Sequence, residues 1–168
     1  MKTVATSHPR SRQEELGQFL TAVPVAGFMA SMFGPLPGVV RLLDAGAGAG
    51  ALTTAFVTRL CRKNEDVEVI EATLYEIDTQ ILDALTANML KCQRLAASAG
   101  IRFTFVIHSA DFIEEMSARL AGNLFGTPPP EFDAAITNPP YKKMPQSRSE
   151  WVTCSHRQNS EWLPSQRI

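Results

Sequence analysis

The residues whose types suggest chemistry stand at the ends of four short apolar runs. These runs end in "DAGAGAG" (44–50), "YEID" (75–78), "SADF" (109–112) and "NPPY" (138–141). The four stretches supply carboxylates, an amide, glycines and prolines, which bind ligands and shape turns. A functional site is therefore expected at one set of strand ends.

The "NPPY" stretch predicts a site that accepts hydrogen bonds from an amine. Pro139 and Pro140 fix φ and remove two N–H donors, so the turn presents carbonyl oxygens, and Asn138 adds an amide oxygen. Two acceptors that bind both hydrogens of a neutral amine make its nitrogen nucleophilic towards a sulfonium methyl group. Tyr141 offers a flat face on which a base can stack. The alternative is a turn that ends a strand and packs a tyrosine.

The "DAGAGAG" stretch predicts a turn that a ligand approaches closely. Gly46, Gly48 and Gly50 permit positive φ, and a helix N-terminus follows them. The Asp44 carboxylate would repel a pyrophosphate but can accept bonds from an ammonium group. The same string also fits the dinucleotide pattern G-x-G-x-x-A through Ala51. A turn that serves only tight packing is the third interpretation.

The two middle stretches predict contacts to a nucleoside. Glu76 follows the second strand, where an acid typically holds ribose hydroxyls, and Ile77 can pack on an adenine face. Asp111 can accept a bond from an adenine amino group, and Phe112 can cover the base. The alternatives are a solvated Glu76 beside a helix-capping Asp78, and an Asp111 that caps a helix.

Strands and helices alternate along the chain. We expect strands at 39–46, 67–78, 101–111 and 132–138, and helices at 51–63, between Asp78 and Gly100, and at 112–122. Two short helical pieces, separated by residues 21–24, precede them. This order predicts an α/β fold with a doubly wound parallel sheet that binds ligands at the carboxyl ends of its strands. The predicted buried helix positions are Leu52, Ala55, Phe56, Leu60, Ile81, Leu85, Met89 and Leu95.

Composition excludes several classes of protein. The 168 residues are 45% apolar and 20% charged, which is typical of a globular protein, and the net charge of −1 gives no nucleic-acid footprint. Three separate cysteines and three scattered histidines predict no metal site. Residues 17–40 are uncharged, but prolines interrupt them, so we expect buried scaffold and no membrane span. Without an apolar leader, a cytoplasmic location is expected.

The four motifs in this order are similar to those of amino-methyltransferases that use S-adenosylmethionine. The chain most resembles the adenine-specific DNA methyltransferases of restriction–modification systems, over residues 10–143. In that family a segment resembling "GQFLTAVPVAGFMA" precedes the glycine motif and closes over the cofactor. Gln18, Phe19, Thr21 and Pro24 match it here.

The resemblance implies S-adenosylmethionine as the cofactor and a flipped adenine of DNA as the methyl acceptor. Asn138 and the Pro139 carbonyl would hold the target amino group, and Tyr141 would stack on the base. The expected catalytic residues are therefore Asn138, Pro139, Pro140 and Tyr141. The expected cofactor-binding residues are Thr21, Asp44, Ala45, Gly46, Gly48, Gly50, Glu76, Ile77, Asp111 and Phe112.

Three segments are expected. Residues 1–38 form a helical segment that closes over the cofactor, and residues 39–143 form an incomplete methyltransferase domain of about four strands. Residues 144–168 are expected to be a divergent or disordered tail, because they lack apolar periodicity and resemble no part of a recognition domain. This indicates a truncated, frameshifted or split protein, and a genuine flexible tail is the alternative. We expect such a chain to bind the cofactor weakly and to methylate DNA poorly without a missing recognition domain or a separate subunit.

Three other functions remain open from the sequence. Methyltransferases that act on RNA adenine or on protein glutamine use the same "NPPY" motif, because the amide nitrogen of glutamine and the amino nitrogen of adenine pose the same chemical problem. A dinucleotide-dependent oxidoreductase would explain the glycines and Glu76 but not "NPPY". The third alternative is a remnant, or a subunit without catalysis of its own.

Overall fold

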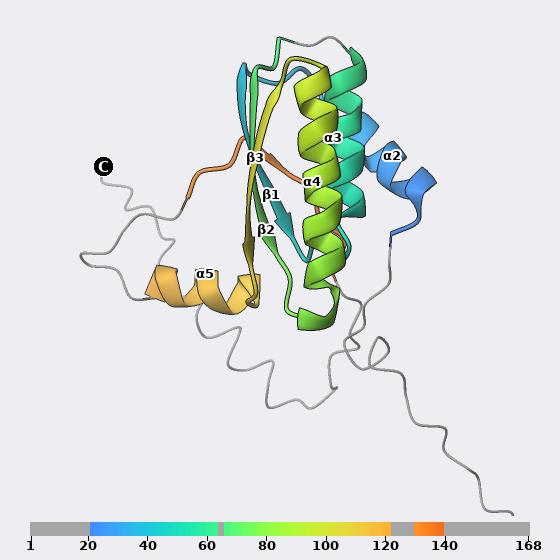
Figure 1. Cartoon of the computed structure of the whole chain (residues 1–168). Helices are drawn as coiled ribbons and strands as arrows, with labels where there is room; N and C mark the ends of the chain where they lie inside the picture. The colour runs from blue at the N-terminus through green and yellow to red at the C-terminus, as the bar shows by residue number, and fades with distance from the viewer. Residues whose placement is uncertain (1–20, 64–65, 122–129, 140–168) are drawn as a thin grey trace, which may run out of the picture.

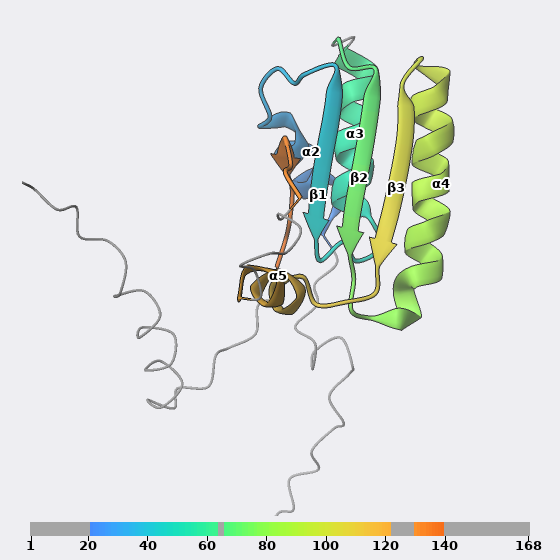
Figure 2. The same cartoon turned by 90° about the vertical axis from the view of Figure 1, so that its left-hand side faces the viewer.

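A computed structural model describes residues 21–63, 66–121 and 130–139. Four parallel strands form one sheet in the order β3-β2-β1-β4 (Figures 1 and 2). Their bounds are Val39–Ala45 for β1, Val69–Tyr75 for β2, Arg102–His108 for β3 and Ala134–Ala135 for β4. The helices are α2 (Val23–Ser31), α3 (Ala51–Lys63), α4 (Leu82–Ser98) and α5 (Phe112–Ala121), with a short 3-10 helix, η1, at Thr79–Ile81.

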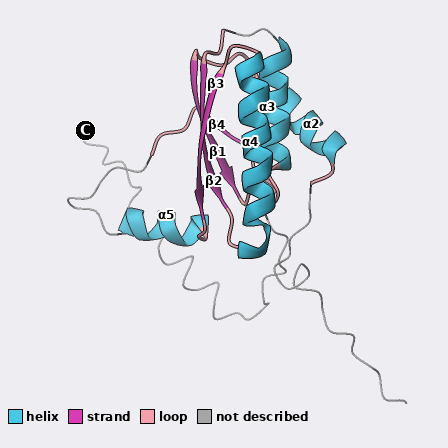
Figure 3. Ribbon diagram, viewed as in Figure 1, coloured by secondary structure: helices cyan, strands magenta, loops and turns pink. Residues whose placement is uncertain are grey.

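The strands and helices alternate in the predicted order, and the predicted α/β fold with a parallel sheet is confirmed. Helices α2, α3 and α4 lie on one side of the sheet, and α5 lies on the other side near the carboxyl ends of the strands (Figure 3). The first of the two helical pieces expected near the N-terminus lies outside the described residues. Within the described residues, no helix is long and apolar enough to cross a membrane.

The core lies between the sheet and α2, α3 and α4. Alternate strand residues face these helices, so Val40 and Leu42 of β1 are fully buried while Arg41 between them is exposed. The predicted faces of α3 and α4 are confirmed at Leu52, Phe56, Leu60, Leu85 and Met89. Leu95 was predicted wrongly, because it is 38% exposed and the helical period brings Cys92 and Ala96 into the core instead.

The strand register brings the three longer strands to a common end. Ala45 of β1 pairs with Tyr75 of β2, and Tyr75 pairs with His108 of β3. The residues that follow these positions therefore leave the sheet at the same edge. The parallel register is the reason that motifs separated by about thirty residues in the sequence meet in space.

Strand β4 is shorter than predicted and is held by polar contacts beside its ladder. Its two residues pair with Leu42 and Leu43 of β1, and Ile136 continues the pairing with an N–H bond of 2.9 Å to the Leu43 carbonyl. The pairing with β1 therefore ends at Ile136, two residues before Asn138, the last residue of the predicted strand. The last residues of this segment are free to leave the strand geometry and turn towards the sheet edge.

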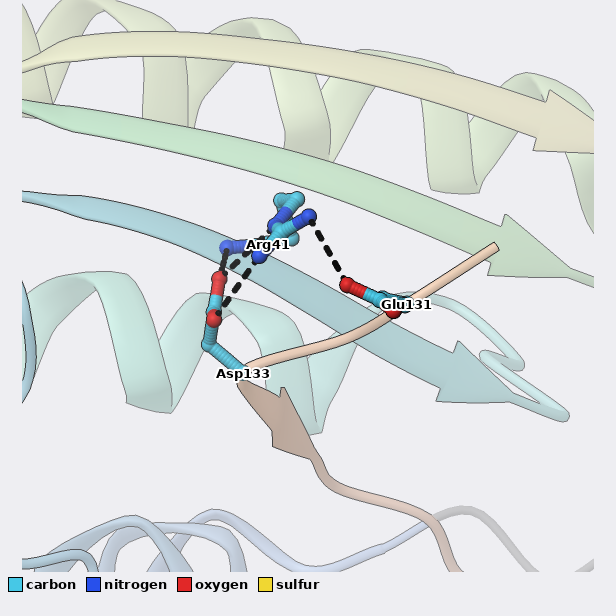
Figure 4. A network of polar contacts seen from close by, with 3 residues as sticks. All are labelled: Arg41, Glu131 and Asp133. Carbon is cyan, nitrogen blue, oxygen red and sulfur yellow. Dashed lines mark hydrogen bonds and ion pairs between the residues drawn. The ribbon is translucent and has the colours of Figure 1, made fainter. Parts of the chain in front are cut away.

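An ion pair at the start of this segment fixes its position on β1 (Figure 4). The carboxylate of Asp133 accepts bonds from the Arg41 backbone N–H at 2.8 Å, from Nε at 3.0 Å and from Nη2 at 3.2 Å. In return the Asp133 N–H donates to the Arg41 carbonyl at 2.9 Å. The guanidinium lowers the pKa of the Asp133 carboxyl through these bonds. Glu131 adds a looser contact of 3.9 Å to Arg41.

Candidate functional site

One cavity of about 310 Å³ opens at the carboxyl edge of the sheet. All four motifs line it, together with Thr21 from the segment before α2. The lining residues that the sequence predicted are Thr21, Ala45, Gly46, Gly48, Glu76, Ile77, Asp111, Phe112, Asn138 and Pro139. Pro140 and Tyr141 lie outside the described residues, so the predicted stacking platform stays a prediction.

The glycine turn begins directly after β1 and is tied to the end of β2. The N–H groups of Gly46 and Ala47 both donate to the Tyr75 carbonyl, at 2.9 and 2.8 Å. Gly46, Gly48 and Gly50 have φ values of 103°, 56° and 84°, which side chains rarely adopt. The turn therefore wraps closely around the strand edge and leads straight into the N-terminus of α3.

The carboxylate of Glu76 holds this turn against β2. Its Oε2 accepts a bond from the Gly48 N–H at 2.8 Å, and its Oε1 accepts one from the Asp78 N–H at 2.7 Å. Glu76 is only 3% exposed, although it lines the cavity. The solvated Glu76 of the alternative interpretation is therefore absent, while the helix-capping Asp78 is present, since its Oδ1 accepts from the Gln80 N–H.

Asp44 does not line the cavity. Side chains alternate along a strand, so Asp44 lies on the same face as Val40 and Leu42, beneath the helices, and is fully buried. Its Oδ2 accepts a bond of 2.7 Å from the Thr53 hydroxyl of α3, and its Oδ1 has no hydrogen-bond donor among the described residues. The predicted contact of Asp44 with the cofactor is a hypothesis that this geometry does not favour.

The environment of Asp44 favours its neutral form. Burial raises the pKa of this carboxyl from 3.8 to about 6. The hydrogen bond from Thr53 opposes the shift, and the negative charge of Glu76 adds to it. The glycine turn therefore rests on a buried carboxyl whose protonation changes close to neutral pH.

Asp111 and Phe112 stand at the N-terminus of α5. The Oδ1 of Asp111 accepts bonds from the N–H groups of Ile113 at 2.8 Å and Glu114 at 3.1 Å, so the predicted helix-cap role is present. The Phe112 ring meets the Tyr75 ring edge-on at 5.1 Å. Both residues also line the cavity, so capping and ligand contact are compatible.

Sequence reasoning missed the role of Tyr75, which docks α5 onto the sheet. Its ring is 2% exposed and stacks on His108 at 4.6 Å, and its hydroxyl donates to Oε1 of Glu115 at 3.3 Å. The same Glu115 oxygen accepts a bond of 2.7 Å from Arg119. The position of Tyr75 in the sequence could have indicated this role, because Tyr75 is the last residue of its strand and precedes Glu76, a predicted cofactor-binding residue.

The end of the β4 segment reaches the glycine turn and the N-terminal segment at once. The Thr137 hydroxyl donates to the Ala45 carbonyl at 2.6 Å, and Nδ2 of Asn138 donates to the Thr21 hydroxyl at 3.0 Å. Sequence reasoning did not identify Thr137. These two bonds bring the predicted amine-binding residues to the cavity that the cofactor-type motifs line.

In the ranges 21–63, 66–121 and 130–139, no three His, Cys, Asp or Glu residues are grouped as a metal ion would need. A second cavity of about 650 Å³ lies among α2, α3 and α4. Its lining is mostly small residues together with Arg59, Arg62, Asn88 and Lys91, and none of the predicted site residues lines it.

Two curated proteins are similar to this chain. It is 33% identical over 132 residues to the Type II methyltransferase M.PstI of Providencia stuartii, which covers 79% of this chain and 25% of the relative. It is 34% identical over 135 residues to the Type II methyltransferase M.BsuBI of Bacillus subtilis, covering 79% and 26%. The chain therefore spans about a quarter of the length of these relatives. The predicted resemblance to methyltransferases of restriction–modification systems is confirmed.

Two solved structures match more distantly. One is a class I S-adenosylmethionine-dependent methyltransferase of Listeria monocytogenes, with a TM-score of 0.44 and 21% identity over 74% of this chain and 32% of that one. The other is the rRNA methyltransferase AviRa of Streptomyces viridochromogenes, with a TM-score of 0.44 and 20% identity over 79% and 68%. No family model matches the chain.

Because Asp44 is protonated more readily in the folded state, stability should fall as the pH rises. The pKa of Asp44 in the folded state, about 6, exceeds the ordinary value of 3.8. The contribution of Asp44 protonation to the free energy of unfolding is therefore fully present below pH 3.8 and is lost as the pH rises to about 6. The full difference corresponds to about 3 kcal/mol. Lowering the pH from 7.5 to 5 should raise the unfolding free energy of the wild type by about 1–2 kcal/mol more than that of Asp44→Asn. Urea denaturation at each pH measures both values.

The exposed Asp66 provides the matched control. Asp66→Asn removes the same charge from the surface and should retain the wild-type pH dependence. Identical slopes for the wild type and Asp44→Asn would show that the buried carboxyl does not titrate in this range.

A side chain at Gly50 should destabilise the glycine turn. A Cβ there would lie 2.6 Å from the Met89 methyl carbon and 2.9 Å from Cδ1 of Leu85, and φ is +84°. We expect Gly50→Ala to lower the unfolding free energy by about 3 kcal/mol, from backbone strain plus overpacking of the core. Gly100 is the control, because its φ is +77° but a Cβ would meet nothing within 4 Å.

Gly100→Ala should therefore show backbone strain alone, about 1–2 kcal/mol in the same urea titration. An equal or smaller loss for Gly50→Ala would contradict the close packing of the turn against α4.

Proposed function

We propose that this chain forms the cofactor-binding and amine-binding part of a DNA methyltransferase of the restriction–modification type. The proposed reaction transfers a methyl group from S-adenosylmethionine to the exocyclic amino group of adenine in DNA. The observation that supports it most is that one cavity is lined both by the glycine turn with Glu76 and by Asn138 with Pro139. The identity of 33–34% to two Type II methyltransferases supports the same reaction class.

The charge of the cavity favours this cofactor over a dinucleotide. The described residues that line it include the carboxylates Glu76 and Asp111 but no Lys, Arg or His. A pyrophosphate there would lie near negative charges without a basic partner. A ligand with a positively charged sulfur and an ammonium group is instead attracted, and the low dielectric near the buried Glu76 strengthens that attraction.

Each part of the cofactor has a matching part of the cavity. Glu76 would hold the ribose hydroxyls, since its carboxylate lines the cavity and is fixed there by bonds to the Gly48 and Asp78 N–H groups. The apolar Ile77 and Phe112 would enclose the adenine, and Asp111 would accept from its amino group. The turn at Gly46 and Gly48 would surround the methionine part. When bound, S-adenosylmethionine supplies a methyl carbon whose bond to sulfur breaks, the electron pair going to sulfur.

Asn138 and Pro139 would prepare the target amine. The Oδ1 of Asn138 and the Pro139 carbonyl accept one hydrogen bond each from the amine and draw its lone pair out of conjugation with the ring. The nitrogen would then be able to accept the methyl group, and its surplus proton would pass to water. Tyr141, which follows in the chain, would stack on the base, and Pro140 keeps the backbone free of competing N–H donors.

Selection of the DNA site is assigned to another part of the enzyme, either a further domain or a separate subunit. The net charge of this chain is −1, which gives little attraction for a phosphate backbone. The relatives are also about four times longer than the part they share with this chain. The proposal places such an enzyme in the cytoplasm, where its DNA lies.

Calorimetry tests the cofactor assignment first. We expect the chain to bind S-adenosylmethionine and S-adenosylhomocysteine but not NAD, and we expect Glu76→Gln to weaken binding about tenfold by replacing one acceptor oxygen with a donor. Glu71→Gln is the matched control, because Glu71 is exposed in the same strand and does not line the cavity. Tighter binding of NAD than of S-adenosylmethionine would refute the assignment.

Tritiated S-adenosylmethionine tests the acceptor. At high protein concentration, label should enter adenine of duplex DNA slowly, and Asn138→Ala should reduce the rate by about 100-fold while retaining cofactor affinity. Parallel assays with RNA and with protein separate the other amine methyltransferases. Label in either of them and none in DNA would assign the site to a different substrate.

A further inference from the structure

A single hydrogen bond joins the proposed catalytic amide to the N-terminal segment. Nδ2 of Asn138 lies 3.0 Å from Oγ1 of Thr21, although 117 positions separate the two residues. Both residues are half-buried, and both line the cavity. The resemblance had implied that Thr21 contacts the cofactor, and it gave no reason for a contact with Asn138.

A partner for the NH2 group of an asparagine amide decides which end of the amide faces a ligand. Its oxygen and its NH2 group are nearly equal in size, so a half-turn of the side chain exchanges acceptor and donor at little steric cost. The proposed chemistry requires the oxygen of Asn138 to face the target amine. With the NH2 group turned towards that amine instead, two donors would meet and no bond would form.

The two ends of this hydrogen bond are fixed by separate parts of the fold. Thr21 precedes α2, which packs on α3 through the buried Ala26 and Ala30. Asn138 follows Thr137, whose hydroxyl bonds to the Ala45 carbonyl at 2.6 Å. The distance between the amide and the hydroxyl is therefore set by the packing of α2 and by the β4 segment together.

We propose that Thr21 is a positioning residue that orients the Asn138 amide for the target amine. Its hydroxyl oxygen accepts from Nδ2, which leaves Oδ1 as the acceptor for the amine. The hydroxyl keeps one proton, and because Thr21 lines the cavity, that proton is available to a ligand acceptor. A hydroxyl that donates to a ligand cannot donate to Asn138, so an occupied cavity strengthens the same amide orientation. This inference rests on the proposed function and assigns a new role within it.

Three variants of the 168-residue chain test the inference. Thr21→Val keeps the shape of the side chain and removes its hydroxyl, and Thr21→Ser restores the hydroxyl. Thr58→Val makes the same change in α3, at a residue that does not line the cavity of Thr21 and Asn138. In 15N-resolved NMR spectra, the Asn138 side-chain amide protons should exchange with water about fivefold faster in Thr21→Val than in the wild type. Thr21→Ser and Thr58→Val should match the wild type.

A second measurement probes the target side of the amide. 2′-Deoxyadenosine is titrated into each variant in the presence of S-adenosylhomocysteine, and its affinity should fall about fivefold in Thr21→Val and recover in Thr21→Ser. The affinity for S-adenosylhomocysteine itself, measured by calorimetry, tests the proposed function separately. An Asn138 amide that exchanges equally in Thr21→Val and the wild type would overturn the inference. Equal deoxyadenosine affinity in all variants, absent binding included, would overturn it as well.

Discussion

The site depends on the hydrogen bonds that the Glu76 carboxylate accepts. This carboxylate joins the glycine turn after β1 to the start of η1 after β2, through backbone bonds of 2.8 and 2.7 Å to Gly48 and Asp78. These bonds compensate the cost of burying the carboxylate, and they hold the turn open as one wall of the cavity. The second buried acid, Asp44, lies beneath the same turn and bonds to Thr53. Of the two acids, only Glu76 lines the cavity, where its carboxylate would attract the positively charged ligand of the proposed function.

The remaining walls depend on how the sheet edge is assembled. Tyr75 stacks on His108 and bonds to Glu115, which docks α5 and so brings Asp111 and Phe112 to the cavity that the glycine turn also lines. On the other side, the pairing of Arg41 with Asp133 fixes a segment whose regular strand is only two residues long. A short strand that ends early lets Asn138 turn into the cavity. The proposed acceptor for an amine and the proposed cofactor pocket thus share one edge for separate structural reasons.

The sequence predicted the order of the elements because alternating apolar runs and helical faces are local signals. It also predicted that Glu76, Asp111 and Asn138 would meet, because parallel strands end at one edge. It did not predict that Asp44 points under the helices, although the alternation from Val40 through Leu42 to Asp44 contained that information. The bond between Thr21 and Asn138 could not be predicted, since it depends on packing between segments 117 residues apart.

The central claim is that the four strand ends form one site for S-adenosylmethionine beside an amine-binding turn. Mapping of backbone amide shifts on addition of S-adenosylhomocysteine tests it most directly. The account predicts that the largest shifts occur together at Gly48, Ile77, Phe112 and Asn138, one from each motif. Shifts confined to the second cavity, near Asn88 and Lys91 between the helices, would contradict it, and so would an unchanged spectrum.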